Sequence, residues 1–159
     1  MSTPLFKAAT LRVQRALSDA GLEVTIVRVA ETARTAEGAA EAVGASVGQI
    51  VKSLVFLSGG EPVLALVSGA NRLDATKLAE QTGAPITRAD ADAVRQATGY
   101  AIGGIPPLGH ATALAVYCDR DLLTFAEVWA AAGTPDTVFA VTPDALVRAT
   151  GAQVCDLAA

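Results

Sequence analysis

Residues 98–110, Thr-Gly-Tyr-Ala-Ile-Gly-Gly-Ile-Pro-Pro-Leu-Gly-His, constrain the fold more than any other segment of this chain. The two adjacent prolines lack backbone N–H groups and have a fixed φ, and the four glycines can adopt backbone angles that other residues avoid. Regular helix or strand is therefore excluded here. A polar linker is excluded as well, because four residues of the segment favour burial: Tyr100, Ile102, Ile105 and Leu108. We predict a rigid, partly buried loop that presents backbone N–H groups to a ligand.

The length and charge of the chain limit what it can bind. A chain of 159 residues predicts one domain, residues 1–159, around a single core. Its formal net charge of −4 is opposite in sign to that of a non-specific duplex binder. A nucleic-acid partner would therefore be bound locally, at one end of a strand, and the alternative is a protein with no polyanionic partner.

Several classes of protein are disfavoured by what the sequence lacks. No apolar run approaches the roughly 18 to 20 residues that span a bilayer, no signal peptide is evident, and two cysteines make no disulfide framework. We expect a cytoplasmic protein with no membrane partner. One histidine and two distant cysteines give no metal-ligand spacing, and no P-loop, dinucleotide fingerprint or Gly-x-Ser-x-Gly elbow occurs. We therefore expect no metal and no cofactor.

Capping residues, glycine stops and runs of β-branched residues predict the elements. Helices are expected over 5–20 (starting at Thr3-Pro4), 35–44, 75–82, 91–98, 124–133 and 142–151, with a short helical turn over 46–52. Strands are expected over 23–30, 54–57, 63–67, 112–118, 138–141 and 154–157, the second and third joined as a hairpin and covered on both faces. This order predicts an α+β fold: a curved, mixed, largely antiparallel and barrel-like sheet surrounded by helices.

Three side chains have both a structural and a functional interpretation. Lys52 lies among apolar neighbours, so it either extends its ammonium to solvent or places a cation at the mouth of a pocket. His110, the only histidine, is either a surface hydrogen-bonding residue or a catalyst. Tyr100 is expected to wall the core, where its hydroxyl would need a partner. Cys118 and Cys155 lie in expected strands, where a free cysteine is commonly a core residue.

Several segments together resemble the YbaK/prolyl-tRNA-synthetase-associated editing domain family, the aminoacyl-tRNA deacylases. The segment Gln49-Ile50-Val51-Lys52-Ser53-Leu54 looks like the family's segment around its key lysine. Residues 98–109 look like its glycine-proline loop, with Gly103-x-x-x-Pro107 in the GxxxP register. Three further segments match in order: Thr35-Ala36, Leu64 to Gly69 and Lys77-Leu78-Ala79.

The resemblance implies a trans-acting enzyme that hydrolyses the ester between a wrong amino acid and the 3′-terminal ribose of tRNA. A small amino acid such as Ala or Cys on tRNA(Pro) or a related tRNA is implied, with an aminoacyl-tRNA synthetase as a further partner. Pro106 departs from the family, many of whose members have a small polar residue there. Expected catalytic residues are Lys52, Gly103, Gly104 and His110. Expected substrate-binding residues are Thr35, Ser53, Gly69, Tyr100, Ile105, Pro106 and Pro107.

Two alternatives remain open. The chain shows no obvious acid, base or nucleophile, so it could be a non-catalytic module that binds an aminoacyl-adenosine-like ligand or a synthetase. A weaker alternative is a general small-ester hydrolase that uses His110.

Overall fold

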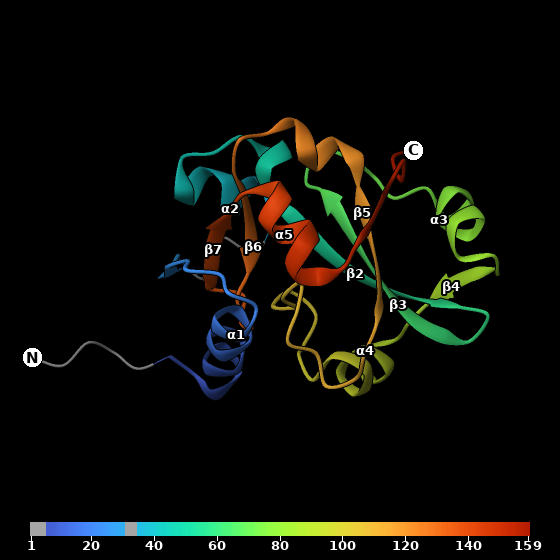
Figure 1. Ribbon diagram of the computed structural model, residues 1–159, viewed down its shortest axis with the longest axis horizontal. Coiled ribbons are helices and arrows are strands. Elements are labelled where there is room, and N and C mark those ends of the chain that lie inside the picture. The colour runs from blue at the N-terminus through green and yellow to red at the C-terminus, as the bar shows by residue number, and fades with distance from the viewer. Residues whose placement is uncertain (1–5, 31–34) are drawn as a thin grey trace, which may run out of the picture.

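The computed structural model describes residues 6–30 and 35–159, and in this part of the chain five α-helices surround two β-sheets (Figure 1). The smaller sheet has the strand order β1-β7-β6, with β1 Ile26–Arg28, β6 Val128–Ala131 and β7 Thr137–Val141. The larger has the order β4-β2-β3-β5-β8, with β2 Val51–Ser58, β3 Glu61–Ser68, β4 Ile86–Arg88, β5 Ala115–Asp119 and β8 Gln153–Cys155. The α+β prediction is confirmed, but two sheets take the place of one barrel-like sheet.

The strand pairing explains how the two sheets meet. Strands β2 and β3 form the predicted hairpin around Gly59 and Gly60, and β3–β5 and β5–β8 are the parallel pairs. Strand β4 pairs only with the last three residues of β2, Phe56–Ser58. The first half of β2 is therefore free to approach the smaller sheet, and the two sheets join where Ile50 forms a parallel bridge with Trp129.

The predicted caps position most of the helices. The side chains of Thr35, Asp74, Asp90 and Thr142 each accept a hydrogen bond from a backbone N–H in the first turn of the helix that follows. The same four helices each end at a glycine in the left-handed conformation. The helices are α1 Ala8–Asp19, α2 Ala36–Val43, α3 Ala75–Thr82, α4 Ala91–Thr98 and α5 Pro143–Thr150. The predicted start at Thr3-Pro4 lies outside the described residues.

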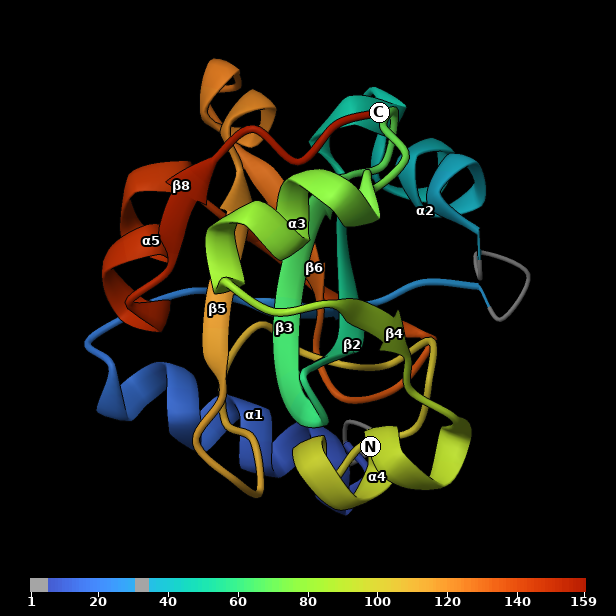
Figure 2. The same cartoon turned by 90° about the vertical axis from the view of Figure 1, so that its right-hand side faces the viewer.

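Strand β3 lies at the centre of the core. Its residues from Val63 to Ser68 are all buried, which confirms the prediction that this strand is covered on both faces. One face packs in the main apolar cluster with Phe139 and Val128, and the other lies under Leu78 of α3 (Figure 2). No helix in the described residues is long and apolar enough to cross a membrane.

Two local predictions were wrong. Lys52 does not belong to a helical turn, because the 3-10 turn ends at Gln49 and Lys52 lies in β2. The helix expected over 124–133 is a 3-10 helix, Arg120–Thr124, followed by strand β6. The hydroxyl of Thr124 donates back to the carbonyl of Asp121 at 2.7 Å and so does not cap a following helix. Strand β4 was not predicted at all.

Candidate active site

A cavity of about 270 Å³ lies where the two sheets meet. Its walls come from helix α2, the first half of β2, strand β6, the start of β7, and Ile102, Gly103 and Ile105 of the glycine-proline loop. Most of the lining is aliphatic, and Trp129 is its aromatic residue. Among the described lining residues, Lys52 alone has an ionisable side chain, and Thr35 and Ser53 supply hydroxyl groups.

Lys52 reaches the cavity because it lies near the start of β2, directly after the junction with β6. Its ammonium donates a hydrogen bond to the main-chain carbonyl of Asn71, just beyond the end of β3. No carboxylate of the described residues forms an ion pair with it. A carbonyl satisfies one ammonium proton without neutralising the charge, so the cation can still attract an anionic or polarised oxygen.

Ser53 follows Lys52 and therefore points to the opposite face of β2. Both residues nevertheless line the cavity. The Oγ of Ser53 is buried, and no described residue forms a hydrogen bond with it. Buried hydroxyl groups are nearly always paired in proteins. Among the described residues, no structural contact accounts for the hydroxyl group of Ser53, which is therefore a candidate for binding a ligand.

The glycine-proline loop forms one rim of the cavity. Gly103, which has a φ of 97°, and Ile105 line the cavity. Ile102, which also lines it, is 61% exposed and so lies at the mouth. Gly104 does not line the cavity: its N–H donates to the carbonyl of Ala101 at 3.1 Å.

Close packing fixes the position of Gly104. A Cβ atom there would lie 2.8 Å from the carbonyl oxygen of Gly133 and from the Cα of Thr134. A Cβ atom on Gly133 would in turn lie 2.9 Å from the carbonyl carbon and oxygen of Ala9 in α1. The loop is thus held against α1 through two glycines, and this contact keeps the rim in place.

Tyr100 and Gly69 have structural positions away from the cavity. Tyr100 is 2% exposed, and its hydroxyl donates to the carbonyl of Gly109 at 2.9 Å, so it walls the core with its hydroxyl satisfied. Gly69 lies in close contact with the carbonyl of Val47, with no room for a side chain. Neither residue lines the cavity.

His110 and the two prolines also lie elsewhere. Pro106 and Pro107 are buried, and the Nε2 of His110 donates to the carbonyl of Pro106 at 2.7 Å. His110 and Pro107 line a separate, more open groove beside helix α5. Burial lowers the pKa of His110. The structure therefore does not bring this imidazole to the cavity.

The two cysteines and the metal-binding side chains offer no further candidate at the cavity. Burial raises the pKa of Cys118 to about 12, so the thiol is not ionised near neutral pH. Neither cysteine lines the cavity. Within residues 6–30 and 35–159, no three His, Cys, Asp or Glu side chains gather as a metal site would require.

Of the eleven residues expected from the sequence, five line the cavity: Thr35, Lys52, Ser53, Gly103 and Ile105. The structure adds two walls that the sequence analysis did not identify. One is the stripe Ala36, Ala39 and Val43, whose helical spacing could have revealed a common face of α2. The other is β6 with Trp129, where buried and half-buried residues alternate in the structure but the sequence Val-Trp-Ala-Ala shows no alternation of apolar and polar residues.

Comparison with known protein families gives one match over most of the chain. The sequence model of the family described as "Aminoacyl-tRNA editing domain" matches residues 30–149. A crystal structure of a proposed trans-editing enzyme for prolyl-tRNA synthetase is 49% identical in sequence. It superposes with a TM-score of 0.94 over 98% of this chain and 99% of that one.

Two curated proteins give more distant similarity. The proposed Cys-tRNA(Pro)/Cys-tRNA(Cys) deacylase EbsC of Enterococcus faecalis is 27% identical over 125 residues, 77% of this chain and 76% of that protein. The proline–tRNA ligase of Maridesulfovibrio salexigens is 35% identical over 104 residues. That match spans 65% of this chain but only 18% of the ligase.

Proposed function

Because the chain belongs to the aminoacyl-tRNA editing domain family, we propose that it is a trans-acting aminoacyl-tRNA deacylase. Its substrate is a tRNA, in the first place tRNA(Pro), that carries a wrong small amino acid such as alanine or cysteine. The names of the similar proteins support this choice, since they refer to prolyl-tRNA synthetase and to Cys-tRNA(Pro). We also propose a cytoplasmic location and an aminoacyl-tRNA synthetase as the source of the substrate.

The observation that carries the proposal is the cavity, with one cation among its described lining residues and a rigid loop at its rim. Its volume of about 270 Å³ lies just below the roughly 300–1,000 Å³ of pockets that enclose drug-sized ligands. The cavity therefore suits an aminoacyl group better than a whole nucleotide. An apolar lining favours a small uncharged side chain.

The reaction needs little chemistry from the protein. Water adds to the carbonyl carbon of the ester and gives a tetrahedral intermediate with a negatively charged oxygen. The carbon–oxygen bond to the ribose then breaks, the ribose oxygen takes a proton, and free tRNA and amino acid leave. Donors held in place before the reaction can stabilise the developing oxyanion, and one such donor typically contributes about 2.7–4 kcal/mol to the transition state.

In this proposal the loop and Lys52 hold the two sides of the ester. The backbone of Gly103 and Ile105 forms the wall against the reacting carbonyl, and Lys52 holds the terminal adenosine and its phosphate. Gly104 acts indirectly, because its contact with Gly133 keeps the loop in place. Thr35 and Ser53 are the remaining polar groups for the substrate.

Deacylation of a panel of mischarged tRNAs tests the proposal. The panel contains Ala-tRNA(Pro) and Cys-tRNA(Pro), with Pro-tRNA(Pro) as the correctly charged control. The wild-type protein should release alanine or cysteine faster than proline. Lys52→Ala should lower kcat/KM by about a hundredfold, since it removes the charged hydrogen-bond donor that holds the substrate phosphate. Lys77→Ala is a matched control, because Lys77 lies away from the cavity and pairs with Asp156.

One observation favours a second candidate, a non-catalytic module that binds an aminoacyl-adenosine-like ligand or a synthetase. None of the described lining residues is a histidine, aspartate, glutamate or cysteine, so no side chain there is an ordinary general base. This candidate predicts that Lys52→Ala abolishes binding of a non-hydrolysable aminoacyl-adenosine analogue. It also predicts that folded wild-type protein turns over no member of the panel, a result that would reject the deacylase.

A further inference from the structure

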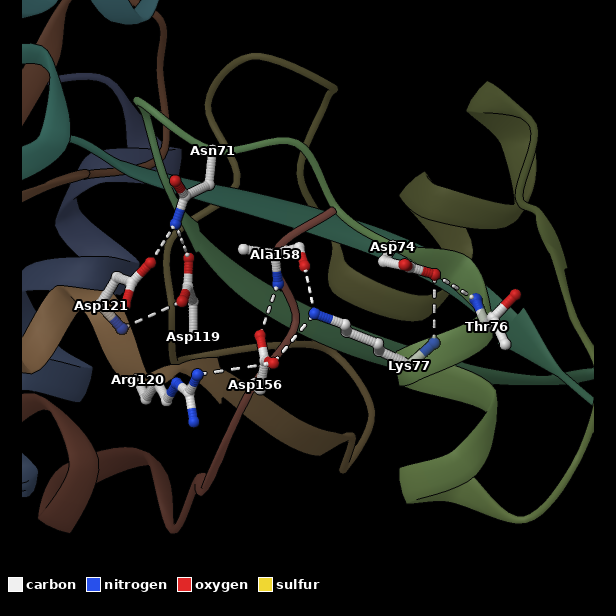
Figure 3. A network of polar contacts seen from close by, with 9 residues as sticks. All are labelled: Asn71, Asp74, Thr76, Lys77, Asp119, Arg120, Asp121, Asp156 and Ala158. Carbon is white, nitrogen blue, oxygen red and sulfur yellow. Dashed lines mark hydrogen bonds and ion pairs between the residues drawn. The ribbon is translucent and has the colours of Figure 1, made fainter.

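The carbonyl that accepts the hydrogen bond of the Lys52 ammonium belongs to a short turn, which is fixed by the buried carboxylate of Asp119 and its partners. Asn71 ends this turn, and its own N–H donates to the carbonyl of Ser68 at 2.9 Å. The side-chain amide of Asn71 donates to Asp119 and to Asp121, both at 2.8 Å (Figure 3). The two carboxylates thus hold the side chain of the residue whose main-chain oxygen holds Lys52.

Asp119 lies at the centre of this hydrogen-bond network. It ends strand β5 and is fully buried, and its carboxylate accepts hydrogen bonds from the N–H of Ser68 at 3.2 Å and from that of Asp121 at 3.0 Å. Together with the amide of Asn71, three donors converge on one carboxylate. A buried carboxylate is tolerated only when hydrogen bonds of this kind satisfy it. The turn and the start of the 3-10 helix are therefore fixed relative to each other.

We infer that Asn71, Asp119 and Asp121 are the positioning residues of Lys52: they fix the Asn71 carbonyl and thereby the place of the ammonium at the cavity. None of the three lines the cavity. Their effect on catalysis rests on the proposed function, whereas their effect on the position of Lys52 does not.

The neighbouring lysine provides a contrast. Lys77 donates to the Asp156 carboxylate at 2.9 Å and to the carbonyl of Ala158 at 2.6 Å, so its charge is neutralised by a direct ion pair (Figure 3). Near Lys52, the carboxylates of Asp119 and Asp121 bind the amide of Asn71 instead of the ammonium. This arrangement orients the cation while leaving its charge available to a substrate.

Chemical labelling tests the position of Lys52 without any need for activity. The sequence contains three lysines, Lys7, Lys52 and Lys77, so peptide mass spectrometry can follow each one during acetylation by an N-hydroxysuccinimide ester. Asn71→Ala keeps the main-chain acceptor of Lys52 but removes both amide hydrogen bonds. It should raise the acetylation rate of Lys52 by about tenfold, and leave that of Lys77 unchanged.

Asp156→Ala is the matched control. It should raise the acetylation rate of Lys77 and leave that of Lys52 unchanged. Asp121→Ala, which removes one of the two acceptors at a partly exposed site, serves if Asn71→Ala does not fold. An acetylation rate of Lys52 that is the same in wild type and in the folded variant would overturn the inference.

A double-mutant cycle tests the same inference through deacylation. If Asn71 acts through Lys52, then Asn71→Ala should lower kcat/KM by about tenfold in the wild-type background. It should lower kcat/KM no further in Lys52→Ala. Losses that multiply would mean an effect of Asn71 that does not pass through Lys52, and would contradict the inference. If the wild-type protein deacylates nothing, the proposed function fails, and the labelling result still decides the role of Asn71.

Discussion

At the scale of single residues, Ser53 combines an unfavourable buried group with a proposed binding role. A buried hydroxyl without a partner costs about 1–3 kcal/mol. We therefore predict that Ser53→Ala leaves the free energy of unfolding unchanged or raises it by about 1 kcal/mol, while lowering kcat/KM for deacylation several-fold. Urea unfolding and steady-state kinetics measure the two effects.

Ser68→Ala is the control for Ser53. The Oγ of Ser68 is also buried but donates to the carbonyl of Gly48 at 2.7 Å, so this variant should lose about 1 kcal/mol of stability. An equal loss in Ser53→Ala would show that the Ser53 hydroxyl is already satisfied in the folded protein.

His110 should make the free energy of unfolding depend on pH, and this dependence can be assigned to one residue. Burial lowers its folded-state pKa, whereas the unfolded chain has a pKa of about 6.5. The unfolded state therefore binds the proton more readily, so the free energy of unfolding should fall as the pH drops below about 6.5. His110 is the only histidine, so His110→Gln should remove this dependence between roughly pH 5.5 and 7.5. Denaturant unfolding at several pH values measures it, and an unchanged slope in the variant would refute the assignment.

At the scale of the elements, helix α2 sets the size of the cavity with small side chains. Ala39 lines the cavity, whereas Ala42 on the same helix is exposed. We predict that Ala39→Leu, which puts three more carbon atoms into about 270 Å³, lowers kcat/KM for Cys-tRNA(Pro) and Ala-tRNA(Pro) by at least about tenfold. Ala42→Leu should change neither. Deacylation rates of the two variants side by side provide the measurement, and equal effects would place the substrate elsewhere.

The elements also show why some of the structure could be predicted and some could not. Caps such as Thr35 and Asp74 act within one helical turn, so the sequence alone reveals them. Strand β6 depends on partners outside its own segment. It pairs with β7 in a hairpin, Ile50 forms a bridge with Trp129, and the side chain of Gln49 donates to the carbonyl of Glu127 at 3.0 Å. These contacts override the local helix signal at Thr124.

Some residues of the candidate site could likewise be predicted from the sequence, and others could not. Lys52 and Gly103 stand out in the sequence by their charge and by the conformational freedom of glycine, and both line the cavity. Gly104 and Tyr100 stand out equally, but their roles in packing follow from contacts with Gly133 and Gly109 that no local pattern encodes. The alanines of α2 have no reactive group to mark them. Their helical spacing indicates a common face, but only the fold shows that this face lines the cavity.

At the scale of the whole molecule, the close packing of Gly104 on Gly133, and of Gly133 on Ala9, joins helix α1 to the rim of the cavity. Gly104→Ala would force its Cβ against the backbone of Gly133 and Thr134, which cannot easily yield. We predict a loss of about 1–3 kcal/mol in stability together with a loss of deacylation, because the rim must shift. Thermal unfolding and kinetics on the same sample provide the measurement.

Gly21→Ala separates the two effects of Gly104→Ala. Gly21 has a φ of 77° and no neighbour within 4 Å, so alanine there should cost about 1–2 kcal/mol from backbone strain alone. Activity should survive in this variant below its melting temperature. Full activity in folded Gly104→Ala would show that the packing of the rim does not matter for the reaction.

Lys52 is the single cation among the described residues that line the cavity, and this predicts how substrate binding depends on ionic strength. Each phosphate of a single strand that a protein neutralises releases condensed counterions and contributes a slope of about −0.7 to log K against log salt. With Lys52 as the one charged group lining the described cavity, and a net charge of −4, the slope for the proposed tRNA substrate should be close to −0.7. Counterion release would then contribute little to affinity, and the choice among substrates would depend on the amino acid in the cavity.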